Sequence, residues 1–189
     1  MKKLLMIINN HSGLKNSKQN LIDAMEIFNT GCYTTGFHNY DDHCYDEILR
    51  KARRLYCVCA DDNHNDYPEE SNRCDSFGGW VVVKADKLGY NTITKALVNG
   101  EFYASTGPEI YDYYYEDDKV YVRCSEAERI VLSSNMRHSK VVCKNKGEYV
   151  TEAVFDAPKT LGYFRVTVYG KDGKKAFTNA TFIDEVRKF

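Results

Sequence analysis

The pattern of apolar residues changes near residue 108, and this change constrains the fold of the chain more than any other feature. Before it, short apolar runs that predict buried strands alternate with segments that predict helices. After it, segments 119–124 and 164–169 alternate apolar and polar residues, as half-exposed strands do. Turn signals recur in this second part at Asp117 and Asp118, Lys146 and Gly147, and Asp172 and Gly173. We therefore predict two domains, residues 1–107 and residues 108–189.

In the first part, the sequence predicts strands and helices that alternate along the chain. Strands are predicted at 4–8, 25–28, 55–60, 80–84 and 102–105. Helices are predicted from about residue 16 toward 25, from Asp41 or Asp42 to about Ala52, and from Asn91 or Thr92 to Asn99. Alternation of this kind indicates βα units and a mainly parallel sheet or barrel. For the second part we predict a small antiparallel, sandwich-like β domain.

Composition and charge exclude several classes of protein. Apolar residues make up 43% of the 189 residues and the formal net charge is −1, so no basic face for nucleic acid is expected. Seven cysteines form an odd set with no disulfide-framework spacing. The apolar run at 4–8 is shorter than a signal peptide requires, and no stretch is long enough to span a membrane. We expect a cytoplasmic protein with no membrane partner.

An Asp-x-His motif is the strongest local signal of chemistry. Asp62 and His64 follow directly after the strand predicted at 55–60, and residues i and i+2 of an extended chain point to the same side. In α/β barrels, active sites are built at the carboxyl ends of strands, and both side chains are good ligands for Zn, Mn or Fe. His11 follows the strand predicted at 4–8 in the same way. The alternatives are a capped turn at 62–64 and an ordinary loop residue at His11.

Other residues carry weaker signals. One loop region holds two cysteines and two histidines, namely Cys32, His38, His43 and Cys44. They could form a zinc cluster, but their spacing matches no familiar structural zinc pattern. Cys57 and Cys59 alternate within a predicted strand, which indicates that they fill a core. Glu26 lies in the strand predicted at 25–28, where it is either functional or an edge residue.

Taken in order, short segments along nearly the whole chain resemble the later part of PHP-domain (polymerase and histidinol phosphatase) metallohydrolases with a β-rich tail. These segments are 10–11, 25–29, 45–49, 54–56, 60–64, 75–80, 96–97, 102–108, 163–165 and 172–179. The resemblance implies a distorted βα barrel, of which this chain would carry the later half, and hydrolysis of a small phosphoester with divalent metal ions. It also implies that His11 is a late ligand, although Ser12 stands where the family usually has Pro. Asp62 and His64 would be the final Asp-x-His ligand pair.

The ligand set implied by the family is incomplete in this sequence. The family's barrel opens with a His-x-His pair, and none occurs among the five histidines, which are His11, His38, His43, His64 and His138. A catalytic metal needs about three protein ligands, and a half-barrel leaves strand edges uncovered. One hypothesis is a metal-dependent phosphoesterase with metal ligands His11, Asp62 and His64. A second is a non-catalytic remnant or subunit that folds with a partner, a missing N-terminal half or another copy. A third is a binding module, which an exposed aromatic patch on the tail would favour.

Overall fold

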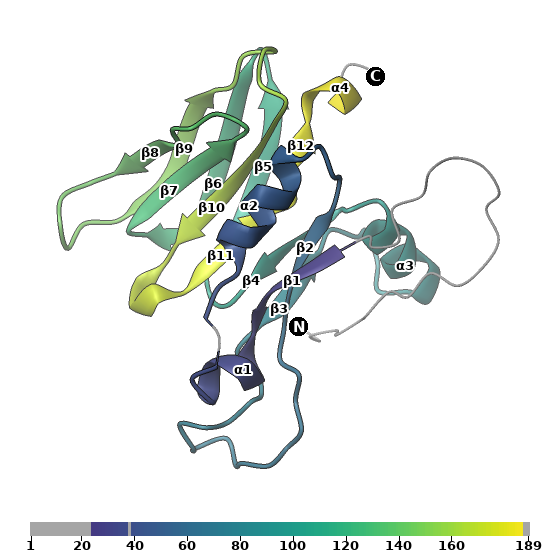
Figure 1. Cartoon of the computed structure of the whole chain (residues 1–189), viewed down its shortest axis with the longest axis vertical. Helices are drawn as coiled ribbons and strands as arrows, with labels where there is room; N and C mark the ends of the chain where they lie inside the picture. The colour runs from purple at the N-terminus through teal and green to yellow at the C-terminus, as the bar shows by residue number, and fades with distance from the viewer. Residues whose placement is uncertain (1–23, 38, 187–189) are drawn as a thin grey trace.

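The computed structural model describes residues 24–37 and 39–186, and within them the chain is mostly β-sheet (Figure 1). Three sheets are present in this part of the chain. The strand predicted at 4–8 and most of the helix predicted from residue 16 lie outside the described residues. None of the helices in the described part is long and apolar enough to cross a membrane.

The smallest sheet is a parallel pair of strands, β1 (Ala24–Asn29) and β2 (Tyr56–Ala60). Between them the chain forms α1 (Thr30–Thr34) and α2 (Asp42–Arg50). Helix α2 buries Tyr45 and Leu49, which lie four residues apart and so share one face of the helix. The Tyr45 hydroxyl donates a hydrogen bond of 2.7 Å to the carbonyl of Leu55, and this bond ties α2 to the entrance of β2.

The largest sheet is antiparallel and runs in the order β3-β4-β11-β10-β7-β8, with β12 paired to β10. Its strands are β3 (Trp80–Val83), β4 (Phe102–Ser105), β7 (Arg129–Ser134), β8 (Lys140–Cys143), β10 (Tyr163–Tyr169), β11 (Lys175–Thr178) and β12 (Thr181–Phe182). Helix α3 (Tyr90–Val98) joins β3 to β4, the short helix η1 (Lys171–Gly173) joins β10 to β11, and α4 (Ile183–Val186) follows β12. Strands on both sides of residue 108 are therefore hydrogen-bonded in one sheet.

The third sheet is antiparallel and contains β5 (Ile110–Glu116), β6 (Lys119–Ala127) and β9 (Val150–Asp156). It faces the largest sheet, and the two share a core to which Val120 and Phe155 contribute from one side and Ile130 and Val166 from the other. Strand β6 alternates buried and accessible residues, so the half-exposed strand predicted at 119–124 is confirmed.

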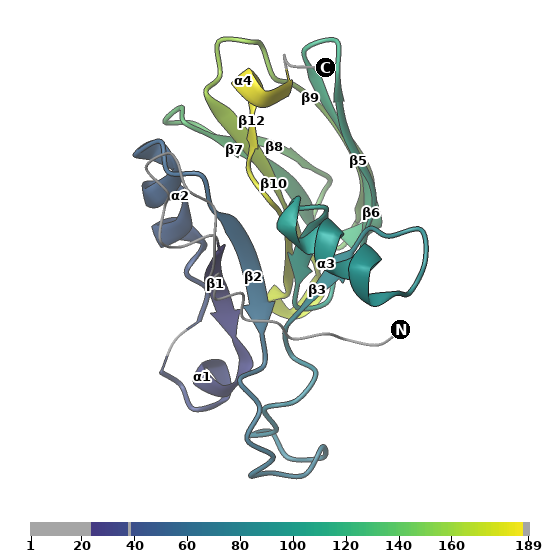
Figure 2. The same ribbon diagram turned by 90° about the vertical axis from the view of Figure 1, so that its right-hand side faces the viewer.

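The described part of the chain has three layers, seen edge-on in Figure 2. The sheet of β5, β6 and β9 is one outer layer, the largest sheet lies in the middle, and α2 with β1 and β2 forms the other. A second apolar cluster fills the space between the largest sheet and the layer of α2, β1 and β2, where Ile27 and Leu49 pack with Tyr163 and Phe177.

Strand β10 lies between these two apolar clusters and is therefore buried on both faces. The prediction of a half-exposed strand at 164–169 is wrong, because α2 covers the face that carries Arg165 and Thr167.

The predicted fold class, a partial distorted βα barrel followed by a small antiparallel sandwich-like domain, is contradicted. In the described part of the chain, β1 and β2 are the only parallel pair, whereas β3 and β4 pair antiparallel even though a helix connects them. Strand β4 then pairs with β11, about 70 residues further along the chain. Within the described residues before 108, the alternation of strands and helices located β1 to β4, α2 and α3 but not the strand pairing, because β11 from the C-terminal part pairs with β4.

Candidate functional site

Polar side chains gather where the parallel strands β1 and β2 end. Asn29 closes β1, and its side-chain oxygen caps α1 by accepting the amide of Cys32 at 2.9 Å. Its Nδ2 lies 3.3 Å from Glu26 Oε2 and 3.3 Å from Asp62 Oδ2, donating to both. One amide group therefore links a carboxylate from β1 to a carboxylate just beyond β2. The carboxyl ends of adjacent parallel strands are a recurrent place for ligand sites.

Asp61 organises the loop that leaves β2. Its carboxylate accepts hydrogen bonds of 2.7–2.8 Å from the backbone amides of Phe77, Gly78 and Gly79, and a 2.8 Å bond from the hydroxyl of Thr30. The carbonyl of Asp61 also accepts the amide of Gly31 at 3.0 Å. Asp61 thus joins the start of α1, the end of β2 and the approach to β3. All of its carboxylate contacts are internal to the fold, so its role is to hold the loop.

The backbone of this loop is unusual at three non-glycine residues. Asp62, Asn65 and Phe77 have φ angles of +52°, +58° and +62°. Such angles are uncommon for non-glycine residues, least so for Asn and Asp, and Phe77 carries a bulky side chain. Residues held in this way cluster at functional sites. Because Asp62 is not extended, the basis on which Asp62 and His64 were predicted to point to the same side does not hold.

His64 lies beside a buried carboxylate instead. The backbone amide of His64 donates to Asp75 Oδ2 at 2.7 Å, and its Nδ1 atom lies 3.9 Å from the same oxygen. The side chain of Asp75 is only 9% exposed, while that of His64 is 65% exposed. The other oxygen of Asp75, Oδ1, is buried and has no hydrogen-bond partner among the residues that the structure describes. Unsatisfied buried oxygens are rare in folded proteins and commonly mark a water, an ion or a functional group.

The pKa of the Glu26 carboxylate is raised in the folded protein. Partial burial of its otherwise exposed side chain raises the pKa above the ordinary value of 4.5. The hydrogen bond from Asn29 opposes this rise, and the neighbouring carboxylates of Asp62 and Asp41 reinforce it. The nearby carboxylates of Asp62 and Asp41 contribute negative potential around Glu26, which favours a cation.

Among the described residues, the structure does not bring the predicted metal ligands together. His11 lies outside the described residues, and Asp62 and His64 contact different partners, Asn29 and Asp75. Among residues 24–37 and 39–186, no group of three or more His, Cys, Asp or Glu side chains could hold a metal ion. The zinc cluster considered for Cys32, His43 and Cys44 is therefore absent from this part of the chain, and His38 lies outside it.

Three residues that shape this region were not singled out from the sequence: Asn29, Asp61 and Asp75. Asn29 and Asp75 lie 33 and 13 residues from Asp62, and no local spacing relates them to it. Gly78 and Gly79 offered one usable signal, since paired glycines before a strand can mark a close backbone approach. A Cβ on Gly79 would lie 2.9 Å from the carbonyl oxygen of Ala60, which confirms such an approach.

The tail carries exposed aromatic side chains. Tyr111 and Tyr114 of β5 are 53% and 44% exposed. The ring of Tyr114 stacks on that of Tyr121 in the neighbouring strand, with centroids 4.7 Å apart and planes within 10°. Each ring thus covers one face of the other. The outer face of this sheet favours the hypothesis of a binding module but defines no ligand.

Comparisons with known proteins identify no relative. None of the protein-family models, curated proteins or solved structures compared with the chain matches it.

Proposed function

We propose that this protein supplies part of the metal-binding site of a divalent-metal-dependent phosphoesterase, with Asp62 and His64 as ligands. The observation that carries the proposal is the Asn29 amide, at the end of β1, shared by the carboxylates of Glu26 within β1 and Asp62 just beyond β2. Support also comes from the resemblance of segment 60–64 to the final ligand pair of PHP-domain metallohydrolases. The βα barrel of that family is not part of the proposal.

The described residues fit an incomplete site. A catalytic metal needs about three protein ligands and an open position, and no such group occurs in the described part of the chain. Further ligands would come from His11, which lies outside the described residues, or from a partner. A bound divalent metal would supply an activated water and stabilise negative charge on the phosphoryl oxygens.

The chain's own residues have separate tasks in this proposal. Asn29 orients the Asp62 carboxylate, since its Nδ2 atom donates to one Asp62 oxygen. Asp75 fixes the backbone at His64 through the 2.7 Å bond from the His64 amide. Asp61 holds the loop between them without reaching the site. Hydrogen bonds to the residues that bind a metal orient those ligands, and their loss commonly reduces metal affinity by roughly 10–100-fold.

Titration of the whole chain with Mn²⁺, followed by electron paramagnetic resonance of the unbound ion, tests the proposal. We expect close to one Mn²⁺ per chain or per oligomer, and at least a tenfold loss of affinity in Asp62→Asn and in His64→Gln. Matched controls are Asp66→Asn on the same exposed loop and His138→Gln between β7 and β8, which should bind as the parent does.

Hydrolysis of bis(p-nitrophenyl) phosphate by the Mn²⁺-loaded chain is the second measurement. The proposal predicts metal-dependent release of nitrophenolate that Asp62→Asn abolishes. Absence of Mn²⁺ binding, or equal binding by the parent and both ligand variants, would contradict it. Binding without hydrolysis would retain the metal site and reject the phosphoesterase.

A non-catalytic subunit that folds with a partner is the second candidate, favoured by the small size of the parallel sheet. Within the described residues, β1 has one ladder partner, β2, and its other side forms a single bridge between Phe28 and Tyr40. Isolated two-stranded sheets are marginally stable, and an open strand edge can pair with another chain. Light scattering over a range of concentrations tests this candidate, and a monomer at all concentrations would rule out self-association.

A further inference from the structure

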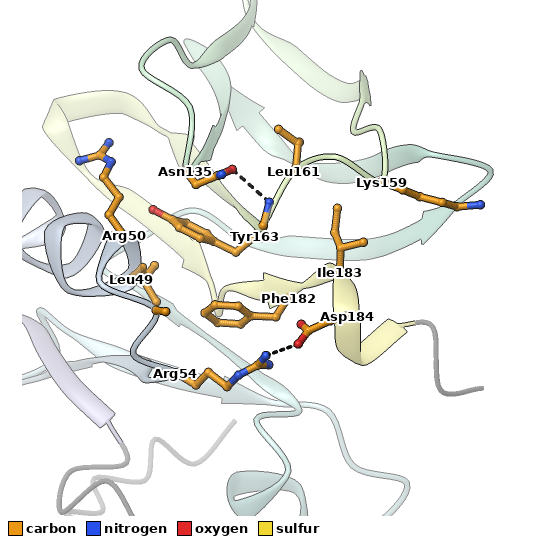
Figure 3. A pocket seen from close by; sticks show the side chains of 12 residues that line it. Leu49, Arg50, Arg54, Asn135, Lys159, Leu161, Tyr163, Phe182, Ile183 and Asp184 are labelled. Carbon is orange, nitrogen blue, oxygen red and sulfur yellow. Dashed lines mark hydrogen bonds and ion pairs between the residues drawn. The ribbon is translucent and has the colours of Figure 1, made fainter.

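A pocket lies at the opposite end of β2 from the candidate site. It is bounded by the end of α2, by the segments near residues 135 and 159–162, and by β12 and α4 (Figure 3). Its volume is about 380 Å³, within the range of small-molecule sites, roughly 300–1,000 Å³. Arg54 precedes β2 and Asp62 follows it, so roughly 16 Å of strand separates the two places.

The floor of the pocket is apolar. Leu49, Tyr163 and Ile183 are almost fully buried and Phe182 is 8% exposed, and Leu161 stands at the rim. Apolar atoms supply most of the exposed lining. A ligand with an apolar body would remove this surface from water, which is favourable in proportion to the area covered.

The rim of the pocket is cationic. Among the described residues that line it, the cations Arg50, Arg54 and Lys159 stand with one carboxylate, that of Asp184. Figure 3 shows the three cations at different sides of the same floor. Guanidinium and ammonium groups bind carboxylate and phosphate groups through charge-assisted hydrogen bonds.

The guanidinium group of Arg54 is restrained by an aromatic ring and a carboxylate. Its guanidinium carbon lies 4.4 Å from the centroid of the Phe182 ring, and its NH2 atom lies 2.6 Å from Asp184 Oδ2. Stacking on an aromatic face restricts the guanidinium, and its planar fork matches a carboxylate or phosphate in geometry. Arg54 therefore loses little conformational freedom when it binds an anion.

The cations already have carboxylate partners that an anion could replace. Arg50 pairs with Glu47 at 2.6 Å and Lys159 with Asp118 at 3.8 Å. The side chains of all three cations are 36–65% exposed. Exposed pairs of this kind contribute little to stability, so replacing one of their carboxylates with the anionic group of a ligand costs little.

We infer that this pocket binds a small organic anion with an apolar body. The inference does not depend on the proposed function, because it uses none of the residues at the carboxyl ends of β1 and β2. The anionic group would lie against Arg54 with Arg50 or Lys159, and the apolar body would cover Phe182 and Ile183.

Nuclear magnetic resonance titration of the whole chain with 1-naphthoate tests the inference, with the methyl groups of Leu161 and Ile183 as reporters. We expect saturable, single-site shifts of these methyls. Naphthalenemethanol, which lacks the charge, and acetate, which lacks the apolar body, should each bind at least tenfold more weakly. Arg54→Gln should weaken 1-naphthoate at least fivefold, and Arg54→Lys should weaken it less.

Arg129→Gln is the matched control, because Arg129 also stacks on an aromatic ring, that of Tyr169 at 3.8 Å, but does not line the pocket. It should leave the 1-naphthoate affinity unchanged. The inference is overturned by shifts that map elsewhere or do not saturate. It is also overturned if naphthalenemethanol binds as tightly as 1-naphthoate, or if Arg54→Gln and Arg129→Gln have equal effects in folded protein.

Discussion

Arg165 of β10 and Asp46 of α2 form a two-fold ion pair inside the protein, with Nε to Oδ1 at 2.6 Å and NH2 to Oδ2 at 2.8 Å. Arg165 is 2% exposed, and its NH1 atom donates to the hydroxyl of Thr167 at 2.7 Å. A planar guanidinium matches a carboxylate in this geometry. The pair fixes α2, and with it β1 and β2, on the middle sheet.

Removing Asp46 should strongly destabilise the fold. Asp46→Ala leaves the Arg165 charge buried without its partner, which typically costs about 3–5 kcal/mol. Urea denaturation followed by circular dichroism measures the change in the free energy of unfolding. Glu47→Ala is the control, because it breaks the exposed pair with Arg50 and should cost less than about 1 kcal/mol. Equal effects of the two substitutions would contradict a buried pair.

Asp61→Asn should loosen the loop between β2 and β3. The Asp61 carboxylate accepts hydrogen bonds from the backbone N–H groups of Phe77, Gly78 and Gly79. An Asn side chain has only one acceptor oxygen, and its NH2 group would face at least one of these N–H donors. We expect a loss of about 2–3 kcal/mol in the free energy of unfolding and faster hydrogen exchange at residues 77–79. Asp66→Asn on the same loop should change neither, and unaltered exchange in Asp61→Asn would refute this role.

Local elements could be predicted from the sequence because they depend on nearby residues. The helix predicted at 41–52 is α2 (Asp42–Arg50), and the strand predicted at 55–60 is β2 (Tyr56–Ala60). Cys57 and Cys59 fill a core, as their alternation indicated. Capping residues and apolar periodicity act over one or two turns of chain, so one segment is sufficient to reveal them.

The arrangement of these elements could not be predicted, because it depends on distant residues. Strand β4 pairs with β11, and nothing in segment 102–105 specifies that neighbour. Arg165 resembled a solvent-facing residue of an alternating strand, but Asp46, more than 100 residues earlier, makes its burial tolerable. The contacts of the candidate site likewise depend on residues that are distant in the sequence. Asp62 and His64 were singled out from their motif, whereas their contacts with Asn29 and Asp75 arise from the fold.

Glu26→Gln should make the protein more stable at neutral pH. The raised pKa of Glu26 means that the folded state holds this proton more tightly than the unfolded state. Its stabilising contribution is therefore complete below the ordinary pKa of 4.5 and is lost as the pH rises through the folded pKa. Gln mimics the protonated form, so we expect a gain of less than about 1 kcal/mol at pH 7, because the side chain is exposed, and almost none at pH 4. Thermal unfolding at both pH values measures it, with Glu69→Gln as control. A gain that is equal at both values would exclude this origin.

Gly79→Ala should destabilise the start of β3 through a contact with backbone. A Cβ at this position would lie 2.9 Å from the carbonyl oxygen and 3.1 Å from the amide nitrogen of Ala60, and neither atom can move without shifting β2. Overpacking of this kind costs about 1–3 kcal/mol. Gly89→Ala is the matched control, because Gly89 is extended and its Cβ would meet only Thr92 at 3.7 Å. Urea denaturation should therefore separate the two variants. The amide of Gly79 donates to the Asp61 carboxylate, which also accepts the amides of Phe77 and Gly78. Gly79→Ala should therefore also accelerate amide hydrogen exchange at residues 77 and 78, which a loss of stability confined to residue 79 would not do.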